Sequence, residues 1–526
     1  MTTSRILFAL GAVVLVLVLV YLTIGSSPRS KSRTNPKIDL VVGIDGSNAD
    51  PGRLAVEEPA RPGEWPKNPN VLLVSIDTLR ADHLGAYGAR RDVSPAIDRL
   101  AEDAVLFDRA FVTVPKTTPS LVSLLSGLHP KSHGVRKLRV AASDKLPLLP
   151  ERLQTAGYAT AGFCGQFNCA RKWGLGRGFD LYEDRFDYDV GHDPDRVGGG
   201  FYPASEKRAA DLVDRTIDWI EEQRGQSQPF FAWLHLMDPH AGYSPPSPYL
   251  DMFAGTTAFS ANSVHGNSVP PDLIHVQAKI QGKEDYDDYV NRYDGEIRYL
   301  DDQLVRLFDY LKKEELYRDS LIVLTADHGE FMGEVDNGVR YFTHGGTLHE
   351  SELRVPLIVK LPARFAAGTR VSRLVSLVDI APTIYWVLGL AAPPVDGLNL
   401  MRGVLDPGSA NARREIFVQK PGDRAVFAVR TDRHKFVFTS RVEIDAAVEV
   451  LRAGEPVPGR YQVFDLKADA LERDNLSENH EQIAKELSGR LANWLVAPSP
   501  MDHQEPLVEV IDEETNRHLR ALGYIE

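Results

Sequence analysis

Five short runs of mostly apolar residues, separated by segments with helical periodicity, limit the folds open to this chain. The runs cover residues 70–76, 158–164, 229–236, 320–326 and 355–361. Runs of this length, rich in Val, Ile, Leu and Phe, are typical of strands buried on both faces. Between them, residues 205–223 and 286–313 repeat apolar side chains at helical spacing. This alternation predicts an α/β fold with a mostly parallel central sheet and helices on both of its faces.

The remainder of the chain predicts three further parts. Residues 6–24 carry no charge and are long enough to cross a bilayer, so we expect residues 1–25 to form a transmembrane helix. A cleaved signal peptide is the alternative, although the apolar run is long for one. Residues 26–67 have the composition of a linker, and the main domain is predicted at residues 68–398. Residues 399–526 predict a smaller C-terminal α+β subdomain with a tail.

Net charge and cysteine count argue against two classes of protein. A net charge of -13 makes nucleic acid an unfavourable partner. Two cysteines, Cys164 and Cys169, are too few for a disulfide framework or a cysteine metal site. They could pair in an oxidising compartment, but we expect two small buried side chains instead.

Metal-type side chains follow three of the predicted strands. Asp77 comes after the first strand, Asp238 and His240 after the third, and Asp327 and His328 after the fourth. Because the carboxyl ends of parallel strands meet at one edge of a sheet, we expect these side chains to converge. Carboxylates combined with imidazoles suit Zn²⁺ or Mn²⁺, whereas carboxylates alone suit Ca²⁺ or Mg²⁺.

Simpler interpretations exist for single members of this set. Asp77 could cap the following helix, and His133 and His235 could be locally hydrogen-bonded histidines. The convergence of several such groups at predicted strand ends favours a metal site over these separate explanations.

Thr117 and Thr118 precede a helix that is predicted at residues 120–128. Pro119 fits the first turn of that helix, where no backbone donor is needed. Backbone N–H groups at such an N-terminus favour an anion, although Thr117 could also be a simple N-cap.

Six segments resemble the sulfatase family of the alkaline phosphatase superfamily. In chain order they are NVLLVSIDTLRADHLGAYG, TTPSLVSLLSGLHPKSHGV, LHLMDPHAGY, LTADHGE, THGGTLHESELRVPLIV and VSLVDIAPT. The resemblance implies the family fold and a two-step transfer, in which a nucleophile attacks sulfur or phosphorus and a second acceptor resolves the covalent intermediate. It places the nucleophile at Thr117 and implies a divalent metal site formed by Asp77, Thr117, Asp327 and His328. Zn²⁺ or Mn²⁺ is favoured there, and Ca²⁺ is the alternative.

The chain departs from sulfatases at several positions of these motifs. Sulfatases build an aldehyde nucleophile from Cys or Ser in a Cys/Ser-x-Pro-x-Arg pattern, where this chain has Thr117 and Leu121. Gln166 and Asn168 stand where sulfate-binding Lys and His are expected, and we assign both to substrate binding. A threonine nucleophile is instead similar to the phosphotransferase and phosphodiesterase branches of the superfamily.

The resemblance also implies a second group of polar residues. In two-metal relatives, Asp, His and a later His hold the second cation, and Asp238, His240 and His344 occur here in that order. Without a second metal, His240 and His344 would contact substrate oxygens or protonate the leaving group. Arg80 is a candidate for anion binding, with an internal salt bridge as the alternative.

We therefore expect a membrane-anchored, metal-dependent hydrolase or transferase that cleaves phosphate or sulfate esters through a covalent Thr117 intermediate. The alternatives are an arylsulfatase-like sulfuric ester hydrolase and a catalytically silent binding protein. The expected substrate is an anionic ester, for example of a lipid or a glycan. The resemblance predicts a periplasmic or otherwise extracytoplasmic catalytic domain, whereas the positive charges after the apolar run, from Arg29 to Lys37, argue for the opposite orientation.

Overall fold

The computed structural model describes most of the chain outside its ends. The described residues are 58–63, 65–185, 206–226, 228–256, 286–336, 339–340, 342–406, 415–453, 459–501, 512, 513 and 516. The predicted transmembrane helix at residues 1–25 and most of the predicted linker at residues 26–67 lie outside this set. None of the helices in the described ranges is both long enough and apolar enough to span a bilayer.

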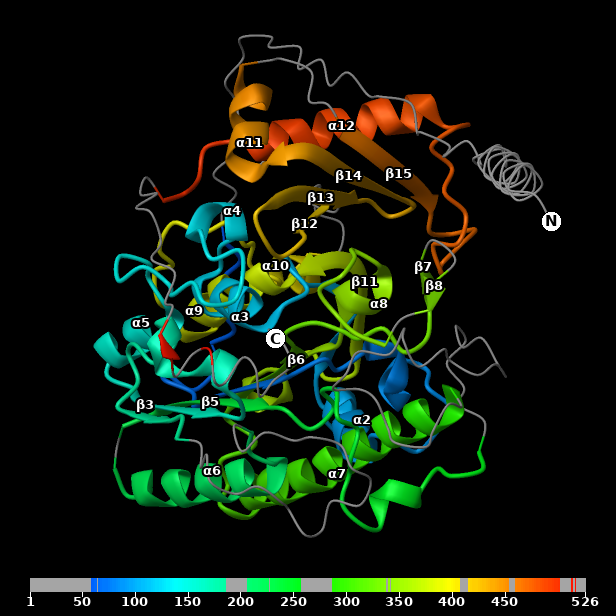
Figure 1. The fold of residues 1–526 in the computed structure, drawn as a ribbon. Helices are drawn as coiled ribbons and strands as arrows, with labels where there is room; N and C mark the ends of the chain where they lie inside the picture. Colours follow the sequence, from blue (N-terminus) through cyan, green and yellow to red (C-terminus); the bar gives the residue numbers. More distant parts are fainter. Residues whose placement is uncertain are drawn as a thin grey trace, which may run out of the picture.

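A nine-stranded sheet forms the centre of the molecule (Figure 1). Its middle strand, β1 (Val71–Ile76), pairs in parallel with β5 (Phe230–Leu236) on one side and with β6 (Leu321–Ala326) on the other. Beyond β5 lie β3 (Ala159–Cys164) and β4 (Leu181–Glu183), also parallel. Every residue of β1, β5 and β6 is buried, as their apolar composition predicts.

The other half of the sheet mixes strand directions. β10 (Leu357–Lys360) runs antiparallel to β6 and to β2 (Val105–Phe111), and β11 (Thr369–Ser376) runs parallel to β2. The short β9 (Arg354–Val355) is antiparallel to β2. β9 and β10 together match the strand predicted at residues 355–361. Pro356, which has no backbone donor, separates them.

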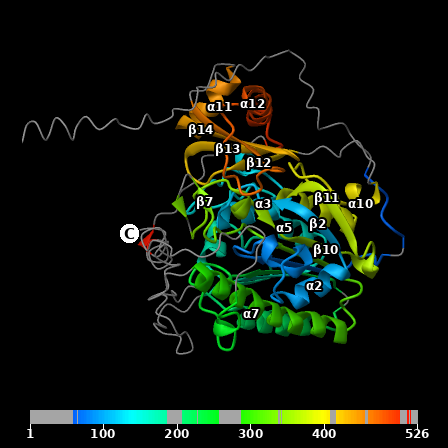
Figure 2. The same ribbon diagram turned by 90° about the vertical axis from the view of Figure 1, so that its right-hand side faces the viewer.

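Helices cover both faces of this sheet (Figures 1 and 2). On one face lie α2 (Pro95–Glu102), α6 (Ala209–Gln223) and α7 (Tyr286–Lys313); on the other lie α3 (Thr117–Ser126), α5 (Leu149–Thr155) and α9 (Ile380–Leu388). Shorter pieces are α4 (Pro130–His133), α8 (Glu350–Leu353), α10 (Met401–Leu405) and the hairpin of β7 (Val335–Asp336) and β8 (Val339–Arg340). The predicted α/β architecture, with a mostly parallel sheet between helices, is thus confirmed.

A second, antiparallel sheet follows in the C-terminal part. It consists of β12 (Ile416–Gln419), β13 (Arg424–Arg430), β14 (His434–Glu443) and β15 (Gly459–Asp465). α11 (Ile444–Arg452) and α12 (Glu481–Val496) cover one of its faces (Figure 2). Apolar side chains of both helices share a core with the sheet. The predicted C-terminal α+β part is present, and the predicted boundary at residue 399 stays a prediction.

The expectation of two unpaired cysteines is wrong. Cys164, at the end of β3, and Cys169 form a disulfide, with a Cα–Cα distance of 5.9 Å. The chain turns sharply between them, which brings the two side chains within bonding distance and encloses Gln166 and Asn168 in a small covalent loop.

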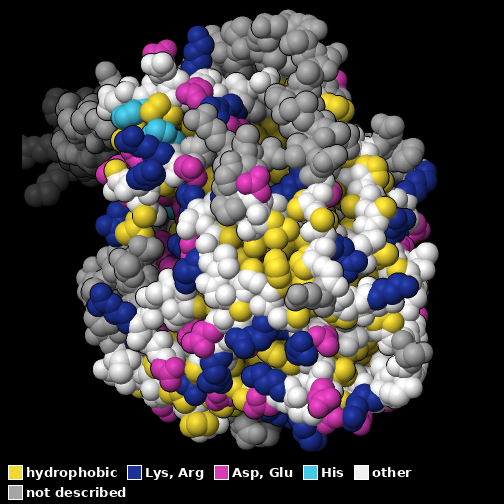
Figure 3. All heavy atoms as spheres, turned by 180° about the vertical axis from the view of Figure 1, so that it is seen from behind, with side chains coloured by type: hydrophobic (Ala, Val, Ile, Leu, Met, Phe, Trp, Pro, Cys, Tyr) yellow, Lys and Arg dark blue, Asp and Glu magenta, His cyan; other side chains and the backbone are white. Residues whose placement is uncertain are grey.

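The surface seen from behind carries charges of both signs. Acidic and basic side chains are mixed over this face, with apolar atoms exposed between them (Figure 3). Such a mixture is typical of a protein surface that faces water.

Candidate active site

Three parallel strands end at the same level and deliver the predicted acidic residues. Ile76 of β1 is in register with Leu236 of β5 and with Ala326 of β6, so Asp77 and Asp327 lie side by side just beyond the sheet. Thr78 turns the chain away with a φ of 56°, and the Tyr293 hydroxyl donates to its carbonyl at 2.8 Å. This conformation is unfavourable for a residue with a side chain, and its persistence at the strand end is typical of functional sites.

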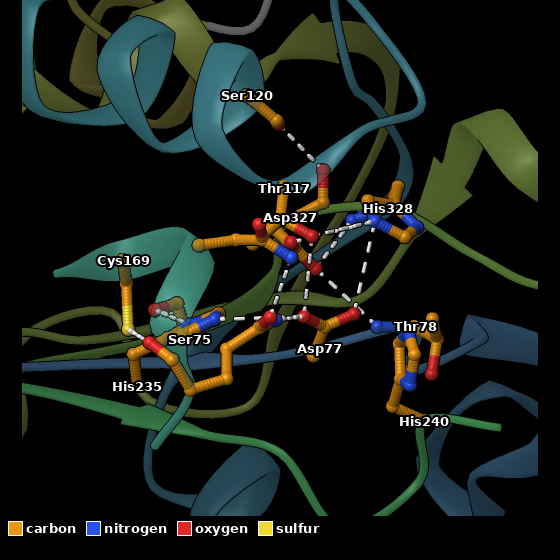
Figure 4. Close-up of polar contacts among 12 residues, drawn as sticks. Ser75, Asp77, Thr78, Thr117, Ser120, Cys169, His235, His240, Asp327 and His328 are labelled. Atoms are coloured by element: carbon orange, nitrogen blue, oxygen red, sulfur yellow. Dashed lines mark hydrogen bonds and ion pairs between the residues drawn. The ribbon is translucent and has the colours of Figure 1, made fainter. Parts of the chain in front are cut away.

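Thr117, Asp77, Asp327 and His328 converge at this edge (Figure 4). Thr117 Oγ1 lies 3.4 Å from Asp77 Oδ2 and 3.4 Å from His328 Nε2. His328 Nε2 lies 3.7 Å from Asp77 Oδ1 and 3.5 Å from Asp327 Oδ2. All four residues are fully buried. Thr117 is the first residue of α3, so the helix N-terminus faces the group.

Hydrogen bonds to the backbone fix the orientation of these side chains. Asp327 Oδ1 accepts from the backbone N–H groups of Thr78 at 3.3 Å and His328 at 2.8 Å. His328 Nδ1 lies 2.9 Å from the Gly329 carbonyl, which can only accept, so Nδ1 carries the proton and the Nε2 lone pair faces Thr117. Burial lowers the pKa of His328 to about 4, which keeps this imidazole neutral at neutral pH.

The donor set fits a divalent cation. Asp77 Oδ1 and Asp327 Oδ2 are buried and have no hydrogen-bond partner among the described residues. Burial and the charge of Asp77 raise the pKa of Asp327 well above its ordinary value. Burial also acts to raise the pKa of Asp77, but His235, His240 and His328 outweigh it and hold that pKa low. Asp77, His235 and Asp327 offer ligand atoms within 4.8 Å of one another, and a cation there would neutralise the adjacent carboxylates.

The family is decided by the sequence match. The sulfatase family model matches residues 69–390, which is more than half of the chain, and the C-terminal model of N-sulphoglucosamine sulphohydrolase matches residues 340–496. The chain belongs to the sulfatase family. It is an ester hydrolase of the alkaline phosphatase superfamily, as the resemblance predicted.

Relatives of this sulfatase-family protein include both sulfatases and a phosphonate hydrolase. An arylsulfatase of Clostridium perfringens is 23% identical, over 80% of this chain and 95% of the relative. An N-acetylglucosamine-6-O-sulfatase of Bacteroides thetaiotaomicron is 22% identical, over 80% and 85%. The phosphonate monoester hydrolase of Agrobacterium radiobacter has a similar structure, with a TM-score of 0.66, 23% identity and coverage of 80% and 94%.

The residues predicted for a second metal are only partly brought together. The His344 ring lies 4.5 Å from the His328 ring and 5.0 Å from the His240 ring, measured between centroids. Asp238, in contrast, accepts from the Ala209 backbone N–H at 3.0 Å and 3.2 Å, at the start of α6. In this sulfatase-family protein, His344 therefore lies next to both His328 and His240, and the second metal stays a prediction.

The predicted substrate-binding residues have different surroundings. Gln166 donates to Asp77 Oδ2 through Nε2, and Asn168 donates to Gln166 Oε1 at 2.8 Å, so both buried amides lie beside Asp77. Arg80 pairs with Asp82 at 2.8 Å and with Glu334 at 2.5 Å. Arg80 thus forms the internal salt bridge that was the alternative interpretation.

Three residues near the site were not predicted. His235 is the penultimate residue of β5, and its Nε2 lies 3.7 Å from Asp77 Oδ2. Glu330 Oε2 lies 3.2 Å from His344 Nδ1. Burial lowers the pKa of Lys116 to about 8, opposed by the charges of Asp77 and Glu330, and this cation precedes Thr117. Two of them had a sequence signal: Lys116 directly precedes the expected nucleophile, and Glu330 ends the segment LTADHGE. His133, by contrast, is locally hydrogen-bonded to Ser123, as its simpler interpretation holds.

Proposed function

We propose that this protein is a membrane-anchored, metal-dependent hydrolase or transferase of phosphate, phosphonate or sulfate esters that uses Thr117 as its nucleophile. One observation carries the proposal: Thr117 Oγ1 lies 3.4 Å from both Asp77 Oδ2 and His328 Nε2, at a helix N-terminus. A bound divalent cation would lower the pKa of the hydroxyl and neutralise charge on the transferred group. Asp77, Asp327 and His328 would hold it, and the imidazole favours Zn²⁺ or Mn²⁺ over Ca²⁺.

The chain's own residues account for both transfer steps. Thr117 gives up its hydroxyl proton to solvent, and its oxygen forms a bond to phosphorus or sulfur while the bond to the leaving oxygen breaks. Water or an acceptor alcohol then loses its proton to His344 and bonds to phosphorus or sulfur, while the bond to Thr117 Oγ1 breaks and Thr117 regains a proton from solvent. Lys116 and the α3 N-terminus face the negative charge of the transferred group.

His344 is the residue we assign to protonation of the leaving oxygen. Burial, with the charges of Glu352 and Asp77, raises the pKa of Glu330 well above its usual value. Glu330 Oε2 lies 3.2 Å from His344 Nδ1, so a protonated Glu330 can donate to this imidazole, and we assign delivery of a proton to the leaving group to the pair. His240 lies beside His344 and would contact the same substrate oxygens.

Phosphorus esters are the substrates that the motif favours. Thr117 cannot serve as the usual Cys or Ser precursor of a sulfatase, and Leu121 replaces the arginine of that pattern. Sulfate esters are the second candidate, because relatives named arylsulfatase and N-acetylglucosamine-6-O-sulfatase cover most of the chain. The third candidate is a catalytically silent binding protein. It would not explain why two buried carboxylates lie beside a hydroxyl and an imidazole.

Substitution of the nucleophile tests the mechanism. Thr117→Ala should lower kcat by roughly 1000-fold or more, while Thr117→Ser retains a measurable part of it. Ser126→Ala is the matched control, because Ser126 lies at the other end of α3 and its hydroxyl donates to Val122 within the helix. Mass spectrometry of the Thr117 peptide during turnover should detect the added phosphoryl or sulfuryl group. Full turnover by Thr117→Ala would exclude this nucleophile.

A paired assay decides between the substrate classes. We expect purified protein with added Mn²⁺ or Zn²⁺ to hydrolyse an aryl phosphodiester or phosphonate faster than an aryl sulfate. Faster cleavage of the sulfate would favour the second candidate, and no turnover of either ester without stoichiometric metal would favour the third.

We also propose that residues 1–25 anchor the protein and that the catalytic domain lies outside the cytoplasm. The Cys164–Cys169 disulfide supports this, because such bonds persist mainly in oxidising compartments. We expect a reporter enzyme that is active only in the periplasm to be active when it is fused after Glu526. Activity of a cytoplasm-specific reporter at the same position would contradict this orientation.

A further inference from the structure

A line of buried polar side chains runs behind Asp77 from β5 to β1. Ser75 of β1 is the register partner of His235 of β5, and Trp233 lies two positions earlier on β5. Residues two apart on a strand share one face of the sheet, so the three side chains meet. All three are buried, and Figure 4 shows Ser75 and His235 next to Asp77.

The hydrogen bonds of this line determine which nitrogen of His235 carries its proton. Trp233 Nε1 can only donate, and it does so to Ser75 Oγ at 2.9 Å. His235 Nδ1, also at 2.9 Å, is the one acceptor for the Ser75 hydrogen among the described residues. Nδ1 therefore accepts, and the proton of the neutral imidazole sits on Nε2.

A protonated Nε2 cannot ligate a cation, but it can donate to a carboxylate. Asp77 Oδ2 is the oxygen that His235 Nε2 faces, at 3.7 Å. The same oxygen accepts from Gln166 Nε2, whose amide is oriented by Asn168 Nδ2 donating to its Oε1. Asp77 Oδ2 thus faces protein donors, while Oδ1 has no hydrogen-bond partner among the described residues.

We propose that Trp233, Ser75 and His235 form a positioning chain that holds Asp77 with Oδ1 directed at the cation, and that His235 is not itself a metal ligand. The inference rests on the proposed function, since it assigns a role toward the metal of that site. Groups that orient a metal ligand in this way typically change metal affinity by about 10- to 100-fold when they are removed.

The metal affinity of the purified full-length protein tests whether Trp233, Ser75 and His235 position Asp77. After treatment with a chelator, each variant is titrated calorimetrically with Mn²⁺. His235→Leu, which has no donor, should weaken Mn²⁺ binding by about 10- to 100-fold. His235→Gln places an amide N–H near the position of Nε2 and should remain within roughly threefold of wild type. Ser75→Ala and Trp233→Phe should each give an intermediate loss.

A matched control separates this effect from general loss of stability. Thr160→Val removes a buried strand hydroxyl, on β3, that donates to Asp180 Oδ2 at 3.0 Å and does not contact Asp77. It should lower the melting temperature without changing Mn²⁺ affinity.

Three outcomes would overturn the inference. Equal losses in His235→Gln and His235→Leu would mean that His235 is a direct ligand. Unchanged affinity in His235→Leu would mean that Asp77 needs no such support, while leaving the proposed function intact. A wild-type protein that binds no divalent metal would overturn the proposed function together with this inference.

Discussion

At the scale of single residues, the site is dominated by two carboxylates that burial brings close together. Asp77 and Asp327 are both fully buried, and His328 lies within 3.7 Å of each. Two adjacent buried charges of the same sign destabilise a fold unless a cation or a proton neutralises them. The site is therefore expected to be less stable without metal than with it.

Metal binding and Asp327 substitution should each stabilise the metal-free protein, because both reduce the repulsion between the two buried carboxylates. Adding Mn²⁺ or Zn²⁺ at about 100 times its Kd to chelator-treated protein should stabilise it by about 2.7 kcal/mol. Asp327→Asn keeps an oxygen for the backbone donors of Thr78 and His328 but removes one charge. This variant should melt above the metal-free wild type and show no shift with metal. A metal-induced shift of equal size in Asp327→Asn would contradict the assignment of Asp327 as a ligand.

The Glu330–His344 pair should matter most for esters with poor leaving groups. Glu330→Gln cannot supply the proton that the pair delivers, so kcat for an alkyl ester should fall by roughly 100-fold, as is typical for loss of general acid catalysis. A nitrophenyl ester needs little protonation of its leaving group and serves as the internal control. An equal loss of kcat for both esters would indicate a structural role for Glu330.

At the scale of secondary structure, strand register and the start of α3 position the site. β1 pairs with β5 and β6 without a shift, which aligns the residues that follow each strand. α3 is held from two sides: Ser120 Oγ donates to the Asp327 carbonyl, and Ser123 Oγ contacts His133 Nε2 at 2.9 Å. His133 therefore links α3 to the short helix α4.

This link should fail in acid. His133 Nδ1 accepts from the Val135 backbone N–H, and burial, with the charges of His129 and Arg136, lowers the pKa of His133 from 6.5 to about 3. Between these values the unfolded chain binds a proton that the folded protein does not. The contribution of His133 to stability is thus complete above pH 6.5 and is lost as the pH falls, by about 2 kcal/mol between pH 7.5 and 5.

Comparison with a variant isolates this contribution. His133→Gln retains the metal site but cannot be protonated, so its stability should decline less between the same two pH values. Urea unfolding at each pH measures the difference. Equal declines for wild type and His133→Gln would show that other groups cause the acid sensitivity.

At the scale of the molecule, the C-terminal sheet docks on the catalytic part through buried charges. Lys435 of β14 is fully buried; its Nζ donates to the Leu348 carbonyl at 2.6 Å and forms an ion pair with Glu472. Arg430 of β13 pairs with Glu350 of α8 at 3.1 Å. These contacts join the second sheet to the loop that follows His344.

Breaking the buried pair should be costly. Lys435→Met leaves the Glu472 carboxylate uncompensated and should destabilise the protein by roughly 3–5 kcal/mol in urea unfolding. Lys137→Met is the matched control: its partner Asp423 also lies in the C-terminal part, but the pair is exposed, so about 0–1 kcal/mol is expected. The double variant Lys435→Met/Glu472→Gln should recover part of the loss. No recovery would mean that the packing of Lys435, rather than its charge, stabilises the protein.

Local sequence patterns were sufficient for much of the fold. The apolar runs predicted β1, β3, β5 and β6, and helical spacing predicted α7 with its observed bounds. β2 and β11 were missed, because polar residues interrupt both strands and neither alternates regularly. Pairing with neighbouring strands, which no local pattern records, stabilises them.

Some residues of the candidate site could likewise be predicted from local sequence patterns, and others could not. Asp77, Asp327 and His328 could be anticipated because each follows an apolar run, and parallel strands necessarily bring their carboxyl ends to one edge. His235 could not, because its contact with Ser75 depends on the register between β1 and β5, which are 160 positions apart in the chain. The Cys164–Cys169 bond likewise depends on a turn whose path is set by packing. Periodicity is a property of neighbouring residues, whereas the direction of a buried side chain toward a distant partner exists only once the strands have paired.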